Sequence, residues 1–288
     1  MATFKDFRNN VKPNWCPGCG DFSIQAAIQR AAANCGLTPE ELAVISGIGC
    51  SGRISGYIHA YGLHGIHGRA LPIAQGVKLA NRDLTVIASG GDGDGFAIGM
   101  GHTIHAIRRN INMTYVVMDN QIYGLTKGQT SPRSAEGFVT KSTPKGSIES
   151  TLSPLELALS AGATFVAQSF SSDIKQLTAL IEEGIKHEGF SIINVFSPCV
   201  TFNKVNTYEW FKENIVNLDT FPEYDPSNRI HAMTKLMETG GLLTGLIYQD
   251  KNRRSYENQI SGFRETPLAE QDLALSEEQF DQLLAEFK

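Results

Sequence analysis

Short apolar runs alternate with stretches of helical spacing over the first two-thirds of the chain. The runs are LAVIS (42–46), LTVIAS (84–89), MTYVVM (113–118), ATFVAQSF (163–170) and FSIINVF (190–196). Helices are expected between them, including one that has Asp21 as its N-cap and ends at Gly36, and others that run through Arg109 and Leu177. Buried strands that alternate with helices are typical of a parallel sheet covered by helices. The sequence therefore predicts an α/β fold with a doubly wound parallel sheet.

The alternation fades at about residue 201, where a mixed segment with many aromatic and charged residues begins. We therefore expect two parts, residues 1–200 and an irregular C-terminal extension, 201–288. The chain closes on SEEQFDQLLAEF (276–287), in which Ser276 and Gln279 form a capping box. One helical stripe is apolar and consists of Phe280, Leu283, Leu284 and Phe287. We expect this stripe to pack on the chain's own domain rather than on a partner subunit.

Composition and charge exclude two classes of partner. The chain has 288 residues, 41% of them hydrophobic, and a net charge of −5, which argues against a nucleic-acid surface because phosphate binding needs a concentrated basic face. No apolar run approaches the ~20 residues that span a membrane. The N-terminus, MATFKDFRNN, has no apolar segment behind a basic one, so no signal peptide is indicated. We expect a cytoplasmic protein with no nucleic-acid or membrane partner.

The cysteines point to a metal site rather than to disulfides. There are five, Cys16, Cys19, Cys35, Cys50 and Cys199, and an odd number in a cytosolic chain does not indicate a disulfide framework. Cys50 follows the first apolar run and Cys199 follows the last, so in a parallel sheet both lie at the same edge. Cys16 and Cys19 precede the first helix and could fold over that edge. Cys35 lies on an apolar helical face, where we expect a buried, inert thiol.

The spacing of these residues leaves more than one kind of site open. Taken alone, NWCPGCGDF (14–22) fits half a zinc site, a redox dithiol or two ligands of an iron–sulfur cluster. Four thiolates suit zinc or a cluster, and spacing alone does not separate the two. A pair of cysteines plus two distant single ones favours the cluster, because structural zinc sites usually use two compact pairs.

A glycine-rich loop after the second run predicts a phosphate and metal site. GGDGDG (90–95) follows one predicted strand, and Asn120 follows the next, 28 positions after Asp92. Both loops leave a parallel sheet at the same edge, where open α/β proteins bind ligands. Glycines let the backbone approach a phosphate, and carboxylate and amide oxygens suit Mg²⁺. The loop is not a dinucleotide fingerprint, because Ile98 stands where Gly93-x-Gly95 needs its third glycine.

This pattern resembles the diphosphate-binding domain of thiamine diphosphate enzymes. The resemblance implies that Asp92 and Asn120 are metal ligands, with the carbonyl of Ile122 as a third. Several further motifs, WCPGCGD, GIGCSG, HGRALPIAQGVKLA, MDNQIYGLTKGQTSP and SPC, are similar to those of the β subunit of 2-oxoacid:ferredoxin oxidoreductases over residues 10–200. That resemblance implies a [4Fe–4S] cluster on Cys16, Cys19, Cys50 and Cys199. It places these residues around thiamine diphosphate: Ile48, Gly49, Cys50, Ser51, His67, Gly93, Asp94, Tyr123, Gly124 and Leu125.

The same resemblance implies the reaction. The expected activity is oxidative decarboxylation of a 2-oxo acid, with coenzyme A taking the acyl group and ferredoxin taking the electrons through the cluster. His67 is expected to contact the ligand. Lys127, in YGLTKGQ, corresponds to a lysine that faces the far end of the substrate, and its ammonium would suit the second carboxylate of 2-oxoglutarate. A pyruvate-preferring enzyme of the same family is the alternative.

A partner subunit is also expected. Enzymes that use thiamine diphosphate need a glutamate at the aminopyrimidine ring from a separate domain, and the ~90 residues after 200 fall short of a typical α/β domain. We therefore expect an obligate α subunit that forms a heterodimer with this chain and supplies that glutamate, much of the substrate pocket and the coenzyme A site. Two other classes remain open: a non-oxidative 2-oxoacid decarboxylase subunit, and a non-enzymatic iron–sulfur or zinc module.

Overall fold

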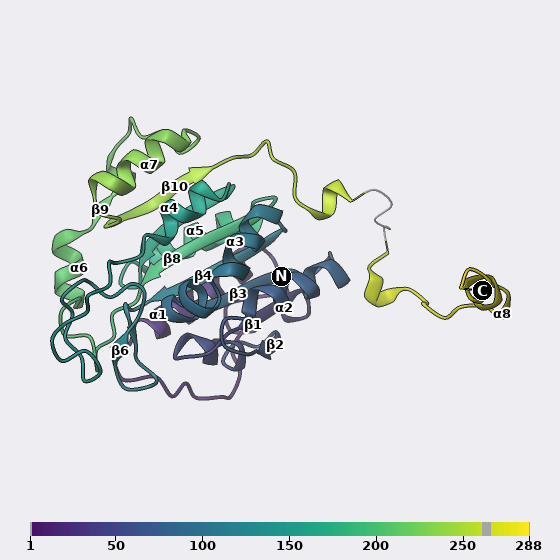
Figure 1. Ribbon diagram of the computed structural model, residues 1–288, viewed down its shortest axis with the longest axis horizontal. Coiled ribbons are helices and arrows are strands. Elements are labelled where there is room, and N and C mark those ends of the chain that lie inside the picture. The colour runs from purple at the N-terminus through teal and green to yellow at the C-terminus, as the bar shows by residue number, and fades with distance from the viewer. Residues whose placement is uncertain (1, 261–265, 288) are drawn as a thin grey trace.

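The computed structural model describes residues 2–260 and 266–287, and its central element is one eight-stranded sheet (Figure 1). In spatial order the strands are β2 (Tyr61–His64), β1 (Leu42–Ser46), β3 (Thr85–Gly91), β4 (Met113–Asp119), β8 (Phe190–Phe196), β7 (Phe165–Phe170), β10 (Leu243–Gln249) and β9 (Val216–Asn217). All neighbours pair in parallel except β7 and β10, which are antiparallel. A small antiparallel pair, β5 (Ile122–Tyr123) and β6 (Gln129–Thr130), follows β4.

Helices cover both faces of the sheet. One face carries α1 (Asp21–Asn34) and α5 (Ile174–Lys186), and the other carries α2 (Ala70–Ala80), α3 (Met100–Arg109), α4 (Pro154–Ser160) and α7 (Arg229–Glu238). The strands alternate accordingly: Val44 packs with the first layer, whereas Ala43 and Ile45 pack with the second. A short helix, α6 (Tyr208–Asn214), packs Phe211 on Phe170 and Phe196. This is the predicted α/β architecture, with a mostly parallel sheet and helices on each side.

Every predicted apolar run forms a strand. Runs 42–46 and 190–196 have the predicted bounds, and the other three shift by one or two residues at one end or, for 84–89, at both. The first helix begins one residue earlier than expected, because Gly20 rather than Asp21 is its N-cap. Strands β2, β9 and β10 of this sheet were not predicted: β2 is exposed at every residue, β9 has only two residues, and β10 includes Gly245 at φ +118° and a register shift between Leu246 and Tyr248. Since β10 joins the main sheet, regular structure continues past residue 200, and the division there stays a prediction.

The expectation for the C-terminal stripe is wrong. The helix α8 (Glu277–Ala285) forms with the predicted capping box between Ser276 and Gln279. However, all four residues of the stripe are exposed, with Phe280 at 51% and Phe287 at 83%, so the stripe does not pack on the domain. Helical periodicity identifies an apolar face but not what covers it, which is why the sequence did not decide this point.

Within residues 2–260 and 266–287, no helix combines the length and the apolar character needed to cross a bilayer. The cytoplasmic location stays a prediction.

Candidate active site at the carboxyl edge of the sheet

Four adjacent strands bring the predicted site residues together. In the order β1, β3, β4 and β8, the strands lie side by side and run parallel, so the loops after them emerge at one edge. The loop after β1 carries Cys50, the loop after β3 carries Asp92, the loop after β4 carries Asn120, and the loop after β8 carries Cys199. The convergence inferred from the sequence is therefore a consequence of strand order.

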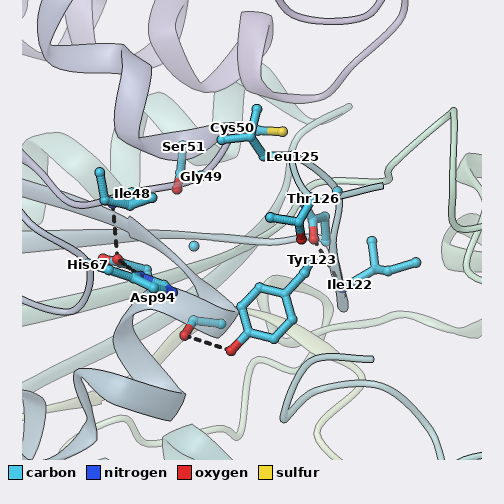
Figure 2. A pocket seen from close by; sticks show the side chains of 14 residues that line it. Ile48, Gly49, Cys50, Ser51, His67, Asp94, Ile122, Tyr123, Leu125 and Thr126 are labelled. Atoms are coloured by element: carbon cyan, nitrogen blue, oxygen red, sulfur yellow. Dashed lines mark hydrogen bonds and ion pairs between the residues drawn. The ribbon is translucent and has the colours of Figure 1, made fainter. Parts of the chain in front are cut away.

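A pocket opens between these loops (Figure 2). Its volume is about 120 Å³, and all ten residues that the sequence placed around the cofactor line it: Ile48, Gly49, Cys50, Ser51, His67, Gly93, Asp94, Tyr123, Gly124 and Leu125. Four more residues also line it: Gly91, Asn120, Ile122 and Thr126. Ligand pockets generally measure about 300–1,000 Å³, so this one is too small to enclose a cofactor and substrate by itself.

Asp94 organises one wall of the pocket. Its buried Oδ1 atom lies 2.6 Å from Nδ1 of His67 and accepts a hydrogen bond from the backbone N–H of Ile48 at 3.0 Å (Figure 2). The same atom accepts a hydrogen bond from the backbone N–H of Gly68 at 2.8 Å. The contact with Asp94 engages Nδ1 of His67, so Nε2 is the other polar atom of the imidazole ring. Across the pocket the Tyr123 hydroxyl donates to the carbonyl of Gly93 at 3.2 Å. The loops after β1 and β3 and the segment before α2 are thus tied together through one carboxylate.

Two glycines are required by close approach. A Cβ atom at Gly47 would lie 1.8 Å from the Asp94 carboxylate, and one at Gly93 would lie 2.1 Å from the Tyr123 ring. These positions admit only a residue without a side chain. Gly47 and Gly93 therefore allow the close packing of Asp94 and Tyr123 around the pocket.

Asp92 is buried beside the pocket with hydrogen-bonding partners of its own. Its Oδ2 atom accepts a hydrogen bond from the Ser131 hydroxyl. Burial and, to a smaller extent, the nearby Asp119 raise the pKa of Asp92 well above its usual range, whereas the bond from Ser131 and the charge of Arg133 oppose that shift. Such a carboxylate favours a cation beside it, and the amide of Asn120 and the carbonyl of Ile122, both at the pocket wall, are oxygen donors of the type that Mg²⁺ binds.

Sequence reasoning missed the polar groups beneath this position. Arg133 is buried, and its Nε atom lies 2.9 Å from Oδ2 of Asp119, while Ser131 reaches Asp92 from the same segment. Ser131 belongs to the quoted TSP stretch and Arg133 follows it, and both lie in the loop between β6 and α4 rather than at the end of a strand of the main sheet. No local pattern in the sequence indicates that this segment folds back over the end of β4.

The four predicted ligand cysteines gather above the pocket. A Cβ atom at Gly124 would lie 3.5 Å from Sγ of Cys199 and 3.7 Å from Sγ of Cys50. Burial raises the pKa of the Cys50 thiol to about 12, with Asp21, Cys199 and Cys16 adding to the shift, and it raises the pKa of Cys19 well above its usual range. Thiols in such surroundings do not ionise by themselves, but a metal centre stabilises their thiolates. Four clustered thiols therefore fit a metal–thiolate group.

Long-range hydrogen bonds hold the N-terminal cysteine segment in place. Nε1 of Trp15 donates to the carbonyl of Cys50 at 2.8 Å, and the Tyr208 hydroxyl donates to the carbonyl of Gly18 at 3.0 Å. The Ser197 hydroxyl donates to Oδ1 of the buried Asp21 at 2.7 Å. Burial raises the pKa of Asp21 to about 6, and the bond from Ser197 opposes that shift. This last bond joins the residue two positions after Cys19 to the residue two positions before Cys199.

Two predicted features lie elsewhere. Cys35 is the C-cap of α1, apart from the other thiols, and it is half-buried rather than buried as expected, with its Sγ atom 4.0 Å from the carbonyl of Glu182. Lys127 does not line the pocket but an exposed hollow next to it. Over the described ranges, 2–260 and 266–287, no three His, Cys, Asp or Glu side chains lie close enough together to hold a single metal ion.

Comparison with known proteins points in one direction. The family model described as "Thiamine pyrophosphate enzyme, C-terminal TPP binding domain" matches residues 47–195, and the model for the C-terminal part of the pyruvate ferredoxin oxidoreductase beta chain matches residues 199–265. The β subunit of a 2-oxoacid:ferredoxin oxidoreductase from Saccharolobus solfataricus is 44% identical over 260 residues, which cover 86% of this chain and 85% of the relative. The KorB subunit of 2-oxoglutarate oxidoreductase from Mycobacterium tuberculosis is 48% identical over 199 residues, which cover 69% of this chain and 53% of the relative.

A solved structure agrees with these relatives. The 2-oxoglutarate:ferredoxin oxidoreductase from Magnetococcus marinus, with 2-oxoglutarate, coenzyme A and succinyl-CoA bound, has a chain that matches with a TM-score of 0.86 and 43% identity. The match covers 89% of this chain and 88% of that one.

Proposed function

Because this chain belongs to the family of 2-oxoacid:ferredoxin oxidoreductase β subunits, we propose that it takes part in the coenzyme A-dependent oxidative decarboxylation of 2-oxoglutarate. The electrons leave through a [4Fe–4S] cluster on Cys16, Cys19, Cys50 and Cys199 and pass to ferredoxin. The observation that carries the proposal is the position of Gly124, which lines the pocket and also lies beside the thiols of Cys50 and Cys199. An electron acceptor at these thiols would thus adjoin the place where a 2-oxo acid is oxidised.

The pocket residues would hold thiamine diphosphate and Mg²⁺. Asp92, Asn120 and the carbonyl of Ile122 would bind the cation, and the glycine-rich loop would take the diphosphate. When bound, thiamine diphosphate supplies the carbanion chemistry that lets a 2-oxo acid lose CO₂. Metal-bridged phosphates need hard oxygen donors, which is the donor set found here.

His67 would contact the ligand at the other wall of the pocket. Asp94 engages its Nδ1 atom at 2.6 Å and so fixes the orientation of the ring. The Nε2 atom can then exchange a proton or a hydrogen bond with a reacting group, as oriented histidines do in acid–base catalysis. Tyr123, whose ring lies edge-on to His67 with 6.4 Å between centroids, closes the space beside it.

The cysteine arrangement favours a cluster over zinc. Structural zinc sites usually take their four ligands from two compact pairs. Here Cys16 and Cys19 form one pair, whereas Cys50 and Cys199 come from two separate loops, and the charges of these thiols influence the pKa values of Cys19 and Cys50. Iron–sulfur clusters are held by four thiolates, and a pair with two distant single cysteines suits such a group.

As a β subunit, the chain works together with an α subunit. The pocket's 120 Å³ is well below the size of ordinary cofactor sites, and its lining contains no glutamate for the aminopyrimidine ring. We propose that the pocket is closed by the α subunit, which also supplies that glutamate. The chain alone should therefore bind cofactor weakly and turn over poorly.

The decisive experiment is to purify the chain with its α subunit and to compare coenzyme A-dependent ferredoxin reduction on 2-oxoglutarate, pyruvate and branched 2-oxo acids. The largest kcat/KM should be for 2-oxoglutarate. Lys127→Ala should lower that value roughly tenfold and leave pyruvate nearly unchanged, because one charge-assisted hydrogen bond to the second carboxylate is worth about 1.5–3 kcal/mol. The isolated chain serves as the control and should show little activity.

Two results would count against this assignment. Full activity of the isolated chain would remove the need for an α subunit. Equal losses on pyruvate and 2-oxoglutarate in Lys127→Ala would mean that the lysine does not contact the second carboxylate. A preference for pyruvate in the wild-type complex would leave the reaction intact and change only the substrate.

The bond between Asp21 and Ser197 should stabilise the cluster. It is buried and joins the two cysteine-bearing segments, so Ser197→Ala should speed cluster loss to an iron chelator roughly threefold to tenfold, as expected when a group that orients metal ligands is removed. The measurement is the decay of absorbance of the cluster in anaerobic buffer. Ser191→Ala is the matched control, because it removes a buried serine bond, to Gly184, at the other end of β8. Equal decay in both variants would show that the bond does not act on the cluster.

A further inference from the structure

We propose that residues 131–134 form a strap that holds the metal-binding residues in place and makes the site prefer Mg²⁺ to Ca²⁺. The inference rests on the proposed function, which places Mg²⁺ on Asp92, Asn120 and the carbonyl of Ile122. It assigns the choice of cation to residues that are not ligands themselves.

The strap is a tight turn in the loop between β6 and α4, and its internal hydrogen bonds hold it in one conformation. The backbone N–H of Ser134 donates to the carbonyl of Ser131 at 3.0 Å, and the backbone N–H of Ser131 donates to the Ser134 hydroxyl at 2.9 Å. The backbone N–H of Arg133 donates to the Ser131 hydroxyl at 3.3 Å. All three residues are buried, so the hydroxyl and guanidinium groups are directed by protein contacts rather than by solvent.

The strap is also attached to the residues just before α4. The backbone N–H of Leu152 donates to the carbonyl of Pro132 at 2.9 Å, and Nη1 of Arg133 donates to the carbonyl of Leu152 at 2.6 Å. The Thr151 hydroxyl donates to the carbonyl of Ser134 at 3.1 Å. Because α4 packs in the helical layer on the sheet, the strap is connected to the core of the domain as well as to the metal site.

Two contacts of the strap hold acidic side chains at the metal site. The Ser131 hydroxyl donates to Oδ2 of Asp92, and Nε of Arg133 donates to Oδ2 of Asp119 at 2.9 Å. Asp119 is buried and directly precedes Asn120 in the chain. The guanidinium offsets the charge of Asp119, so the proposed cation meets the charge of one carboxylate rather than two.

A third contact holds a strained backbone turn. Gln121 has a φ of +59°, a left-handed conformation that is costly for a residue with a long side chain. Its carbonyl accepts a hydrogen bond from the Ser134 hydroxyl at 2.6 Å. Within the same turn, the backbone N–H of Ile122 donates to Oδ1 of Asn120 at 3.1 Å. Two of the three proposed ligands therefore flank the residue that the strap holds.

A rigid site of this kind suits a cation with strict geometric requirements. Mg²⁺ demands near-ideal octahedral coordination at about 2.0–2.1 Å, whereas Ca²⁺ accepts flexible arrangements with oxygen atoms at about 2.3–2.6 Å. Loosening the turn between two ligands should therefore cost more Mg²⁺ affinity than Ca²⁺ affinity. A strap that served only the stability of the fold would affect the two cations alike.

The test measures the concentrations of Mg²⁺ and Ca²⁺ that give half-maximal binding of thiamine diphosphate to the purified αβ complex, by equilibrium dialysis without substrate. Ser134→Ala should raise the Mg²⁺ concentration about tenfold, as is typical when a group that orients metal ligands is lost, and the Ca²⁺ concentration at most about twofold. At saturating Mg²⁺, kcat should stay within about twofold of the wild type, because no ligand is removed. Ser147→Ala is the matched control, because it removes a buried hydroxyl of the same loop that accepts from the backbone N–H of Glu149.

A double variant tests the strained turn directly. Asparagine adopts left-handed backbone conformations more readily than most other residues. Adding Gln121→Asn to Ser134→Ala should therefore recover about threefold of the lost Mg²⁺ affinity, because the turn then costs less without the strap. In the otherwise wild-type complex, Gln121→Asn should change the Mg²⁺ requirement little, since the strap already holds the turn.

The possible results separate this inference from the proposed function. Equal shifts for Mg²⁺ and Ca²⁺ in Ser134→Ala, or no shift for either, would overturn the strap's role in cation choice, provided that the wild type binds thiamine diphosphate. Failure of the wild-type complex to bind thiamine diphosphate with any divalent cation would instead contradict the proposed function. The melting temperature of the cofactor-free complex controls for folding. If Ser134→Ala does not fold, the exposed Thr151→Ala loosens the strap from its other side and should shift the Mg²⁺ requirement more than that of Ca²⁺.

Discussion

Replacing Asp92 with asparagine should abolish catalysis by the αβ complex, with kcat/KM falling by about 10³-fold or more, because a metal ion that neutralises phosphate charge contributes several kcal/mol. The variant keeps the shape of the side chain but removes the only carboxylate of the proposed Mg²⁺ site. Binding of thiamine diphosphate, measured by equilibrium dialysis in the presence of Mg²⁺, should fall with the activity. The rise in melting temperature that the cofactor gives the wild type should disappear as well.

The fold itself should survive this change. Burial raises the pKa of Asp92, so the fold gains nothing from the charged form of this side chain. Ser131→Ala is the matched control, because it removes the hydroxyl that bonds to Asp92 but none of the proposed ligands. It should lower kcat/KM by only about tenfold to a hundredfold. Normal thiamine diphosphate binding in Asp92→Asn would contradict the proposed metal site.

The site residues that come directly after a strand could be predicted from the sequence. Runs 42–46 and 190–196 are buried at every residue, so their apolar character was sufficient to identify β1 and β8. Once the strands are placed in a parallel sheet, the residues after them must share an edge. Asp92 and Asn120 were therefore recognisable as neighbours although they are distant in the chain.

The features that depend on pairing between distant segments could not be predicted. Cys199 lies beside Gly124 because β8 pairs with β4, and no periodicity in the sequence encodes that strand order. Ser131 contacts Asp92 from a loop without regular structure. The direction of the Lys127 side chain depends on the positive φ of that residue, which the sequence does not indicate. The C-terminal stripe shows the same limit, because an amphipathic pattern does not specify its partner.

Replacing Cys16 with serine should break the path of electrons while leaving the diphosphate site intact. We expect Cys16→Ser to lower ferredoxin reduction at least about a hundredfold, since a hard serine oxygen is a poor substitute for a thiolate on iron. Cys16 is exposed, so the change creates no cavity in the core and the fold should be retained. Thiamine diphosphate binding should stay near that of the wild type, because Cys16 does not line the pocket.

The contrast with Cys35→Ser makes this prediction specific. Cys35 lies at the C-cap of α1, away from the other thiols, so its loss should leave the iron content, the visible absorbance and the rate of ferredoxin reduction unchanged. Iron content and absorbance of the as-purified protein decide between a cluster and zinc independently of activity. A colourless wild-type protein with one zinc per chain would contradict the cluster and would favour a non-oxidative enzyme. Loss of thiamine diphosphate binding in Cys16→Ser would mean that the thiols hold the pocket together, and that the cluster and the cofactor site are one structural unit rather than two adjoining ones.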